Sequence, residues 1–255
     1  WFVTEATKRD FRSWPFTLDL EREIVLASKR TLVRARQEMA RQHTSLPPEE
    51  QIAREYNGGF YTPYYGHLNA ALVDNSTALV YASYLVAVDD RKEVLQHRAN
   101  LPDEAFYYGP IWSEYDGQYG SGILVVAVSY LWATSEHPDP KGEHLRDLAQ
   151  FLRWLMRSDR CKRTKVVVFM DWVSLYMDHP LGSRTPEHTE AFEAGLANVQ
   201  KWYAHPNSLT LLAKKKAKTR EWPFNESGWP VFERAVSNMA KAKDHVLDLG
   251  AIVTW

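Results

Sequence analysis

Between residues 123 and 250 the sequence alternates short apolar runs with stretches whose apolar residues recur at helical spacing. Ile123 to Ser129 is a nearly continuous apolar run, typical of a strand buried on both faces, and one apolar stripe predicts a helix from Glu143 to Ser158. Lys165 to Asp171 and Ser208 to Leu212 repeat the strand pattern. Such alternation favours right-handed crossovers, so the sequence predicts an α/β fold with a mainly parallel sheet flanked by helices.

The end of the chain extends this pattern. Thr185, Pro186 and Glu187 supply a cap, a first-turn proline and an acid near the positive end of a helix. A further apolar stripe runs from Val231 to Met239, and the segment from His245 to Leu249 suits a last strand.

Residues 1–121 have a different composition. A proline-free run from Leu18 to about Gln42 and a segment from Pro47 to Asn57 predict helices, and Leu68 to Leu95 is expected to be helical with an interruption near Asp74. Residues 1–17 and 60–66 are irregular and aromatic. We therefore expect a helical, aromatic-rich extension over residues 1–121, packed on a main α/β domain over residues 122–255.

Composition excludes several classes of protein. The 31 basic and 32 acidic residues leave a net charge of −1, so a nucleic-acid partner is not expected. The single cysteine, Cys161, excludes a disulfide framework and suits an intracellular, reducing compartment. No run is long enough to span a membrane. The sequence begins at Trp1, so we expect either the cytoplasm or an organelle reached with a leader that is then removed.

Motifs for bound metals and cofactors are missing as well. The sequence has no phosphate-binding glycine loop, no glycine-rich dinucleotide fingerprint and no serine-hydrolase elbow. His137, Asp139 and His144 are separated by prolines and share no helical face, which favours loop capping over metal ligation. Neither a metal nor a cofactor is expected.

Parallel sheets bind ligands beyond the carboxyl ends of their strands. The residues at that edge are Ser129, Tyr130 and Trp132 after the first strand and Asp171 after the second. They are the candidate ligand-binding residues of this region.

A second candidate segment runs from Ser227 to Glu233. Pro230 belongs in a first turn, so Glu233 should lie one turn inside a helix, on the face of Trp229. The positive helix end should keep the Glu233 carboxylate ionised, as a group that stabilises a developing cation requires. The alternative is a structural acid beside a packed tryptophan.

This segment, Ser-Gly-Trp-Pro-Val-Phe-Glu, resembles the S-x-W-C-x-x-E stretch of TIR domains, with Pro230 at the cysteine position. Val126 to Trp132 is similar to the A-L-S-Y-x-W start of fungal heterokaryon-incompatibility (HET) domains, which are TIR-like relatives. Residues 170–175, Glu190 and residues 202–205 resemble the second strand and later motifs of that family, with Tyr176 in place of its glutamine. The resemblance covers residues 122–250 and implies a TIR/flavodoxin-like fold.

Two functions follow from the resemblance. The first is hydrolysis of the nicotinamide–ribose bond of NAD or a related nucleotide, with Glu233 as the catalytic residue and Ser129, Tyr130, Trp132, Asp171, Ser227 and Trp229 as substrate-binding residues. The second is a non-catalytic interaction or scaffold module, such as an accessory subunit of a larger assembly. Protein partners or self-association are expected in either case. The retained Ser227, Trp229 and Glu233 favour the enzyme, whereas Pro230 and Tyr176 favour the module.

Overall fold

A computed structural model describes residues 72, 74–108, 123–158, 161, 164–205, 208–214 and 223–252 of the 255-residue chain. The aromatic arm, the two helices expected before residue 60 and the aromatic loop of residues 60–66 lie outside the described residues.

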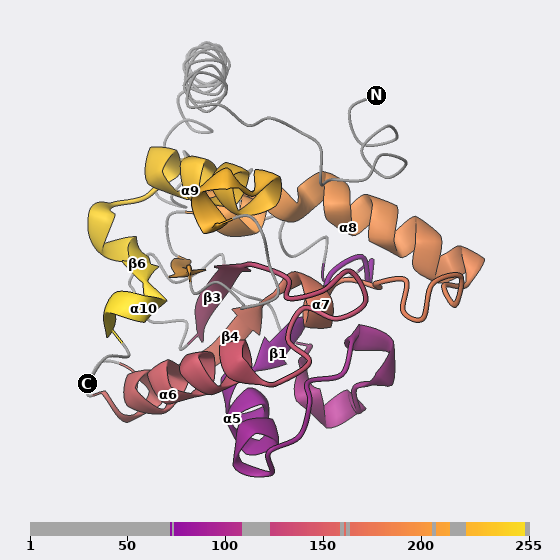
Figure 1. The fold of residues 1–255 in the computed structure, drawn as a ribbon, viewed down its shortest axis with the longest axis horizontal. Coiled ribbons are helices and arrows are strands. Elements are labelled where there is room, and N and C mark those ends of the chain that lie inside the picture. Colours follow the sequence, from indigo (N-terminus) through magenta and orange to yellow (C-terminus); the bar gives the residue numbers. More distant parts are fainter. Residues whose placement is uncertain are drawn as a thin grey trace, which may run out of the picture.

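The described residues form one six-stranded sheet in the order β2-β1-β4-β3-β5-β6 (Figure 1). The strands are β1 (Leu79–Tyr81), β2 (Phe106–Tyr107), β3 (Ile123–Tyr130), β4 (Lys165–Phe169), β5 (Leu209–Ala213) and β6 (Val246–Asp248). Strand β3 pairs in parallel with both β4 and β5, and β5 pairs in parallel with β6. Strand β1 is antiparallel to both β4 and β2. The mainly parallel α/β fold expected from the sequence is confirmed at this level.

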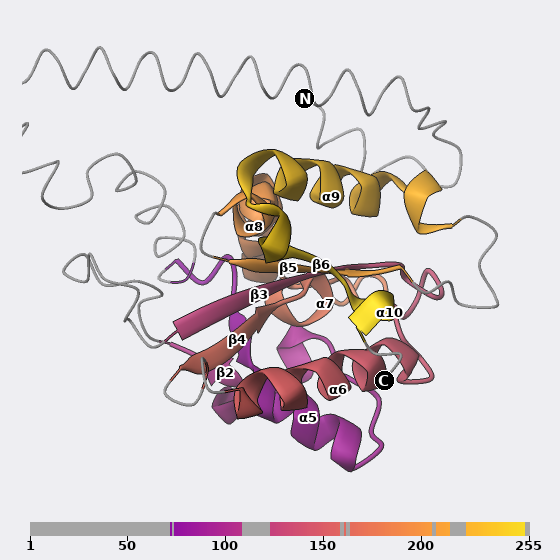
Figure 2. The ribbon, with the colours of Figure 1, turned by 90° about the vertical axis from the view of Figure 1, so that its left-hand side faces the viewer.

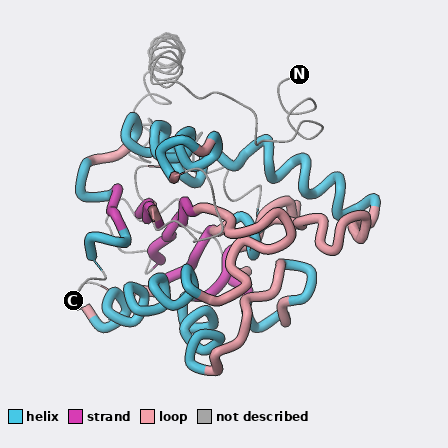
Figure 3. The backbone as a smooth tube through the Cα atoms, viewed as in Figure 1, coloured by secondary structure: helices cyan, strands magenta, loops and turns pink. Residues whose placement is uncertain are grey.

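Helices cover both faces of the sheet, as the side view shows (Figure 2). Helices α5 (Ala82–Asp90) and α6 (Glu143–Arg157) lie on one face, and α8 (Pro186–Ala204) and α9 (Gly228–Ala240) lie on the other. Short helices α7 (Asp171–Ser174) and α10 (Leu249–Ile252) follow β4 and β6. Short 3₁₀ turns are η2 (Arg98–Asn100), η3 (Asp103–Ala105), η4 (Phe224–Glu226) and η5 (Lys243–His245). Long loops gather where β3 and β4 end (Figure 3).

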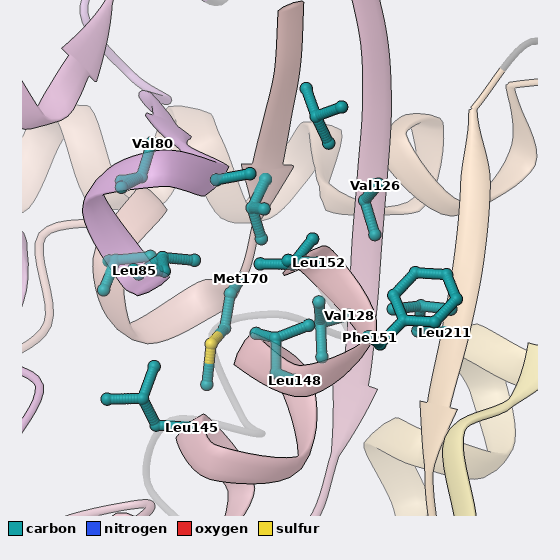
Figure 4. Close-up of a cluster of buried hydrophobic side chains, with 14 of the residues drawn as sticks. Val80, Leu85, Val126, Val128, Leu145, Leu148, Phe151, Leu152, Met170 and Leu211 are labelled. Atoms are coloured by element: carbon teal, nitrogen blue, oxygen red, sulfur yellow. The ribbon is translucent and has the colours of Figure 1, made fainter. Parts of the chain in front are cut away.

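The sheet separates two apolar layers. Between the sheet and α5 and α6, residues such as Val126, Val128, Leu148 and Met170 interdigitate (Figure 4). On the other face Phe169 stacks on Trp202, with ring centroids 5.2 Å apart. Burial on both faces explains why β3 and β4 are almost entirely apolar in sequence.

The expected start of α8 is confirmed. Thr185 is its N-cap, and the Thr185 hydroxyl accepts a hydrogen bond from the backbone N–H of His188 at 3.2 Å. Pro186 occupies the first helical position, where no backbone donor is needed.

One expected element is wrong. The interruption near Asp74 is present, but Leu79 to Tyr81 form strand β1, and within the described stretch 74–95 the helix is limited to Ala82 to Asp90. Leu79 and Val80 are fully buried, because β4 offers this segment a free edge with which to pair. Pairing of this kind overrides local helix propensity, and it makes the sheet draw on residues on both sides of position 121.

Gly195 of α8 allows that helix to lie against the turn before β1. A Cβ atom at Gly195 would lie 2.5 Å from Ser76 O and 2.7 Å from Leu175 Cδ2, which is closer than packed atoms approach. Alanine favours a helix over glycine by about 1 kcal/mol, but overpacking costs about 1–3 kcal/mol.

We therefore expect Gly195→Ala to lower the free energy of unfolding, measured by urea denaturation. Gly250→Ala is the control, because its nearest contact would be an ordinary 3.4 Å. Equal stabilities of the two variants would contradict the close packing of α8 on the Ser76 turn.

Candidate functional site at the carboxyl edge of the sheet

Asp171 begins α7 directly after β4 and receives three hydrogen bonds. Tyr130 OH donates to Oδ1 at 2.6 Å, Trp132 Nε1 donates to Oδ2 at 3.0 Å, and the backbone N–H of Trp172 donates to Oδ1 at 2.7 Å. Burial raises the pKa of Asp171, and these three donors act against that rise. Three residues selected from sequence are thus brought together by the parallel pairing of β3 and β4.

Glu233 of α9 lies at the same edge. Burial, with a contribution from the charge of Asp171, raises the pKa of Glu233 to about 8, although contacts with Ser129 and Tyr203 act against that rise. Ser129 Oγ is fully buried close to the Glu233 carboxyl, but the contact lacks the geometry of a regular hydrogen bond. Tyr203 OH donates to Val128 O at 3.0 Å, so its single proton is already engaged.

The expectation that the helix end keeps Glu233 ionised is wrong. Only 7% of Glu233 is exposed, and the residue lies more than one turn inside α9, which begins at Gly228. The helix dipole acts mainly within the first turn, whereas burial acts fully on a carboxylate. Glu233 is therefore mostly protonated at neutral pH.

Ser227 and Trp229 are placed differently from the other candidates. Ser227 Oγ donates to Pro223 O at 3.1 Å, which ties it to η4. Trp229 is 37% exposed and meets Phe232 edge to face, with ring centroids 5.9 Å apart. Glu233 is buried whereas Trp229 reaches the surface, so the two side chains expected on one face of the helix differ in their access to solvent.

An aromatic and histidine cluster that was not selected from sequence surrounds Trp172. Trp132 packs edge to face on Trp172 with centroids 5.5 Å apart, and three imidazoles also contact the indole. These imidazoles belong to His97, His137 and His179, with centroids at 5.6, 4.8 and 5.2 Å. The three histidines lie in separate loops, so no single sequence motif contains them and the cluster could not be predicted from their spacing.

Loop capping by Asp139 is confirmed. Its Oδ1 accepts from the backbone N–H of Glu143 at 2.7 Å, and Oδ2 accepts from that of Leu145 at 2.8 Å, so the carboxylate caps α6. His144 packs edge to face on Tyr130 with centroids 5.7 Å apart. Within the described residues, no group of three or more His, Cys, Asp or Glu side chains is arranged to hold a metal ion.

Tyr176, at the position of the glutamine of the HET pattern, has a packing role. Its ring lies between the Arg98 guanidinium, 4.0 Å from the ring centroid, and the stacked His188 ring, also at 4.0 Å. Asn75 Nδ2 donates to Tyr176 OH at 3.2 Å. These contacts engage both faces and the hydroxyl of Tyr176.

A buried lysine lies at the opposite edge of the sheet, after the end of α9. Lys241 Nζ donates to Ser208 Oγ at 2.8 Å and to Thr210 Oγ1 at 2.6 Å. In the part of the chain that the structure describes, no carboxylate pairs with Lys241, and burial lowers its pKa to about 7. The nearby Lys241 also adds to the burial that lowers the pKa of His205 to about 3.

Comparison of the chain with protein-family models, with curated proteins and with solved structures gives no match. Helices able to cross a membrane are likewise absent from the described ranges, where none is both long and apolar enough.

The raised pKa of Glu233 predicts a pH dependence of stability. Between its unfolded pKa of 4.5 and its folded pKa of about 8, only the folded state keeps the proton. The stabilisation is therefore complete below about pH 4.5 and is lost as the pH rises through 8, with a slope of at most about 1.4 kcal/mol per pH unit.

Glu233→Gln should remove this slope, so the variant gains stability over the wild type as the pH rises from about 4.5 to about 8, measured by urea unfolding. Glu226→Gln is the control, because Glu226 is exposed just before the same helix. If the difference in free energy of unfolding between Glu233→Gln and the wild type does not change with pH, Glu233 is not a buried neutral acid.

The lowered pKa of Lys241 predicts the opposite dependence. Between its folded pKa of about 7 and its unfolded pKa of 10.5, the unfolded state holds the extra proton, so stability rises with pH. Lys241→Met should remove this rise and be at least as stable as the wild type near pH 7. Lys243→Met, at an exposed position, is the control. A strong loss of stability near pH 7 in Lys241→Met alone would contradict the prediction.

Proposed function

We propose that this chain is a TIR-like hydrolase that cleaves the nicotinamide–ribose bond of NAD or a related nucleotide. The observation that carries the proposal is the coupling of two carboxyl groups, Glu233 and Asp171, at the carboxyl edge of a parallel sheet. Perturbed, interacting acids are characteristic of catalytic sites, and this edge is where open parallel sheets bind ligands.

The order of the strands also supports the proposal. Counted along the chain, the four mutually parallel strands β3, β4, β5 and β6 lie in the spatial order second, first, third, fourth. That order is the beginning of the flavodoxin-like arrangement 2-1-3-4-5, which the resemblance to TIR domains implies. The crevice rule for such sheets points to the ends of β3 and its neighbours, where Ser129 and Tyr130 lie.

Because Glu233 is protonated in the free protein, the reaction must begin with substrate binding and loss of the Glu233 proton. A nucleotide with a positively charged pyridinium ring favours the ionised form of a nearby carboxyl group, so binding drives the loss of the Glu233 proton. The resulting carboxylate stabilises the oxocarbenium-like ribose as the bond from C1′ to the ring nitrogen breaks. The bonding electron pair leaves with neutral nicotinamide, and water adds to C1′ and releases a proton.

Asp171 has a positioning role in this proposal. Its carboxyl group is held by Tyr130, Trp132 and the backbone of Trp172, so it fixes two aromatic side chains at the edge. Its negative charge also raises the pKa of Glu233, which keeps that acid protonated until a cation arrives.

The alternative function is a non-catalytic interaction module. The exposed side chains of Trp154 on α6 and of Trp229 on α9, 61% and 37% accessible, favour it, because exposed aromatics are common in protein interfaces. The small exposure of Glu233 also favours a structural acid.

Nicotinamide release from NAD separates the two functions. We expect the wild-type chain to release nicotinamide and Glu233→Gln to lose at least about 100-fold in rate, because the amide keeps the size but cannot become an anion. Chromatography of the products measures both rates, and the exposed Glu226→Gln should match the wild type.

Equal release by the wild type and Glu233→Gln would overturn the catalytic assignment. No release by a folded wild type, together with concentration-dependent self-association in light scattering, would support the module instead.

A further inference from the structure

The imidazoles of His97, His137 and His179 form a compact cluster around one indole, that of Trp172. The centroids of His97 and His179 are 5.6 Å apart, and those of His137 and His179 are 6.4 Å apart. His97 precedes η2, His137 lies in the loop between β3 and α6, and His179 lies in the loop before α8. The cluster therefore joins three segments at the carboxyl edge of the sheet.

Hydrogen bonds fix the neutral form of His137. Its Nδ1 accepts a hydrogen bond from the backbone N–H of Asp139, with the two nitrogens 2.9 Å apart, so Nδ1 itself carries no hydrogen. Its Nε2 lies 3.2 Å from Leu95 O and must donate to that carbonyl. Trp172 Nε1 donates to the same carbonyl at 2.9 Å. Protonation of His137 at Nδ1 would break the bond from Asp139.

That bond connects the cluster to α6. Asp139 follows His137 by two residues and caps α6 through both of its carboxylate oxygens. The loop is also closed on itself by a hydrogen bond from Ala133 N–H to Pro138 O at 2.8 Å. Loss of the Asp139 bond would therefore detach Asp139 from the His137 ring while the internal hydrogen bond of the loop is retained. It would also weaken the first turn of α6, which Asp139 caps.

The surroundings of the cluster disfavour positive charge on its imidazoles. His97 is 5% exposed, and within the described residues its Nδ1 has no hydrogen-bond partner. His188 adds a further imidazole near His97. The carboxylate of Asp139 faces His137 but is already shared between two N–H groups of α6. Asp178, the chain neighbour of His179, accepts from the N–H groups of Gly182 and Arg184.

Two further charged groups flank these elements. The Arg98 guanidinium, next in sequence to His97, donates to the carbonyl groups of Ser76 and Ser174. The Asp171 carboxyl lies under Trp132, with its bonds already made to Tyr130 and Trp132. Asp139, Asp171 and Asp178 each already accept two or more hydrogen bonds, so none of these three acids is an uncommitted counterion for a second imidazolium.

We infer that His97, His137 and His179 form an acid-operated switch, which holds the loop of residues 133–142 against the Asp171 edge while the imidazoles are neutral. Protonation of His137 breaks the bond from Asp139, and protonation of His179 together with His97 or His137 places like charges about 6 Å apart, so the loop is released. The switch controls access to this edge whatever ligand binds there.

The titration of the cluster fits this device. Burial lowers the pKa of both His97 and His137, and the charge of His179 also acts to lower both. At His137 the bond to Leu95 and the charge of Asp139 act against this fall without cancelling it. Because the folded pKa values lie below 6.5, the stabilisation is present above that pH and is lost as the pH falls through the folded values.

Amide hydrogen exchange of the full chain tests the switch. Exchange of the amides of Asp139, Glu143 and Leu145, corrected for the intrinsic rate, should accelerate at least about tenfold between about pH 7.5 and about pH 5.5. His137→Gln should suppress this change, because its amide can accept from Asp139 and donate to Leu95 at every pH. His245→Gln, outside the cluster, should respond like the wild type.

Unchanged protection of these amides in the wild type at acid pH would overturn the inference. So would an equal acceleration in a folded His137→Gln variant. If His137→Gln does not fold, His179→Gln provides the second variant, because it removes one of the repelling charges and leaves the Asp139 bond in place. Its acceleration should be clearly smaller than that of the wild type, and equality would again overturn the switch.

Discussion

The parallel pairing of β3 with β4 on one side and with β5 on the other is the constraint on which the rest of the structure depends. Because β3 is central, both of its faces must be covered by helices, and its sequence is correspondingly apolar. The same pairing aligns the ends of the strands, so that Tyr130 reaches Asp171 beyond β4 and Ser129 lies beneath Glu233 of α9. Thus the residues that form the core also determine which polar groups meet at the carboxyl edge.

The number of hydrogen-bond donors determines which of the two acids at that edge, Asp171 and Glu233, holds a charge and which holds a proton. Three donors offset much of the cost of burying Asp171, whereas Glu233 has weaker support from Ser129 and from a tyrosine hydroxyl that donates elsewhere. Two buried carboxyl groups whose charges interact, as the charge of Asp171 acts on Glu233, then tend to divide into one that holds charge and one that holds a proton. This division is the property that a cationic substrate would exploit, and it arises from the number of donors available to each acid.

The sequence predicted those features that depend on local pattern. The strand from Ile123, the cap at Thr185 and the place of Pro230 in the first turn of α9 are all confirmed, because periodicity and caps act within a few residues. Strand β1 was missed because Leu79 to Tyr81 are held extended by pairing with β4 and β2, which are distant in sequence. Likewise, the protonation of Glu233 and the histidine cluster depend on burial and on contacts between distant loops, which spacing along one chain does not encode.

Three buried groups of this fold, Glu233, Lys241 and His137, have pKa values shifted toward their neutral forms. Lys241 has two hydroxyl acceptors, matching the two protons of a neutral amine, while His137 is fixed as one tautomer by a donor and an acceptor. Neutrality avoids the cost of burying unpaired charge, but it leaves each group sensitive to any event that adds or removes a proton. At the carboxyl edge Glu233 and the histidine cluster are linked through Asp171, whose charge acts on Glu233 and whose partner Trp132 packs on Trp172 of the cluster. A cationic ligand would remove a proton from this edge, whereas an acid environment would add protons to it.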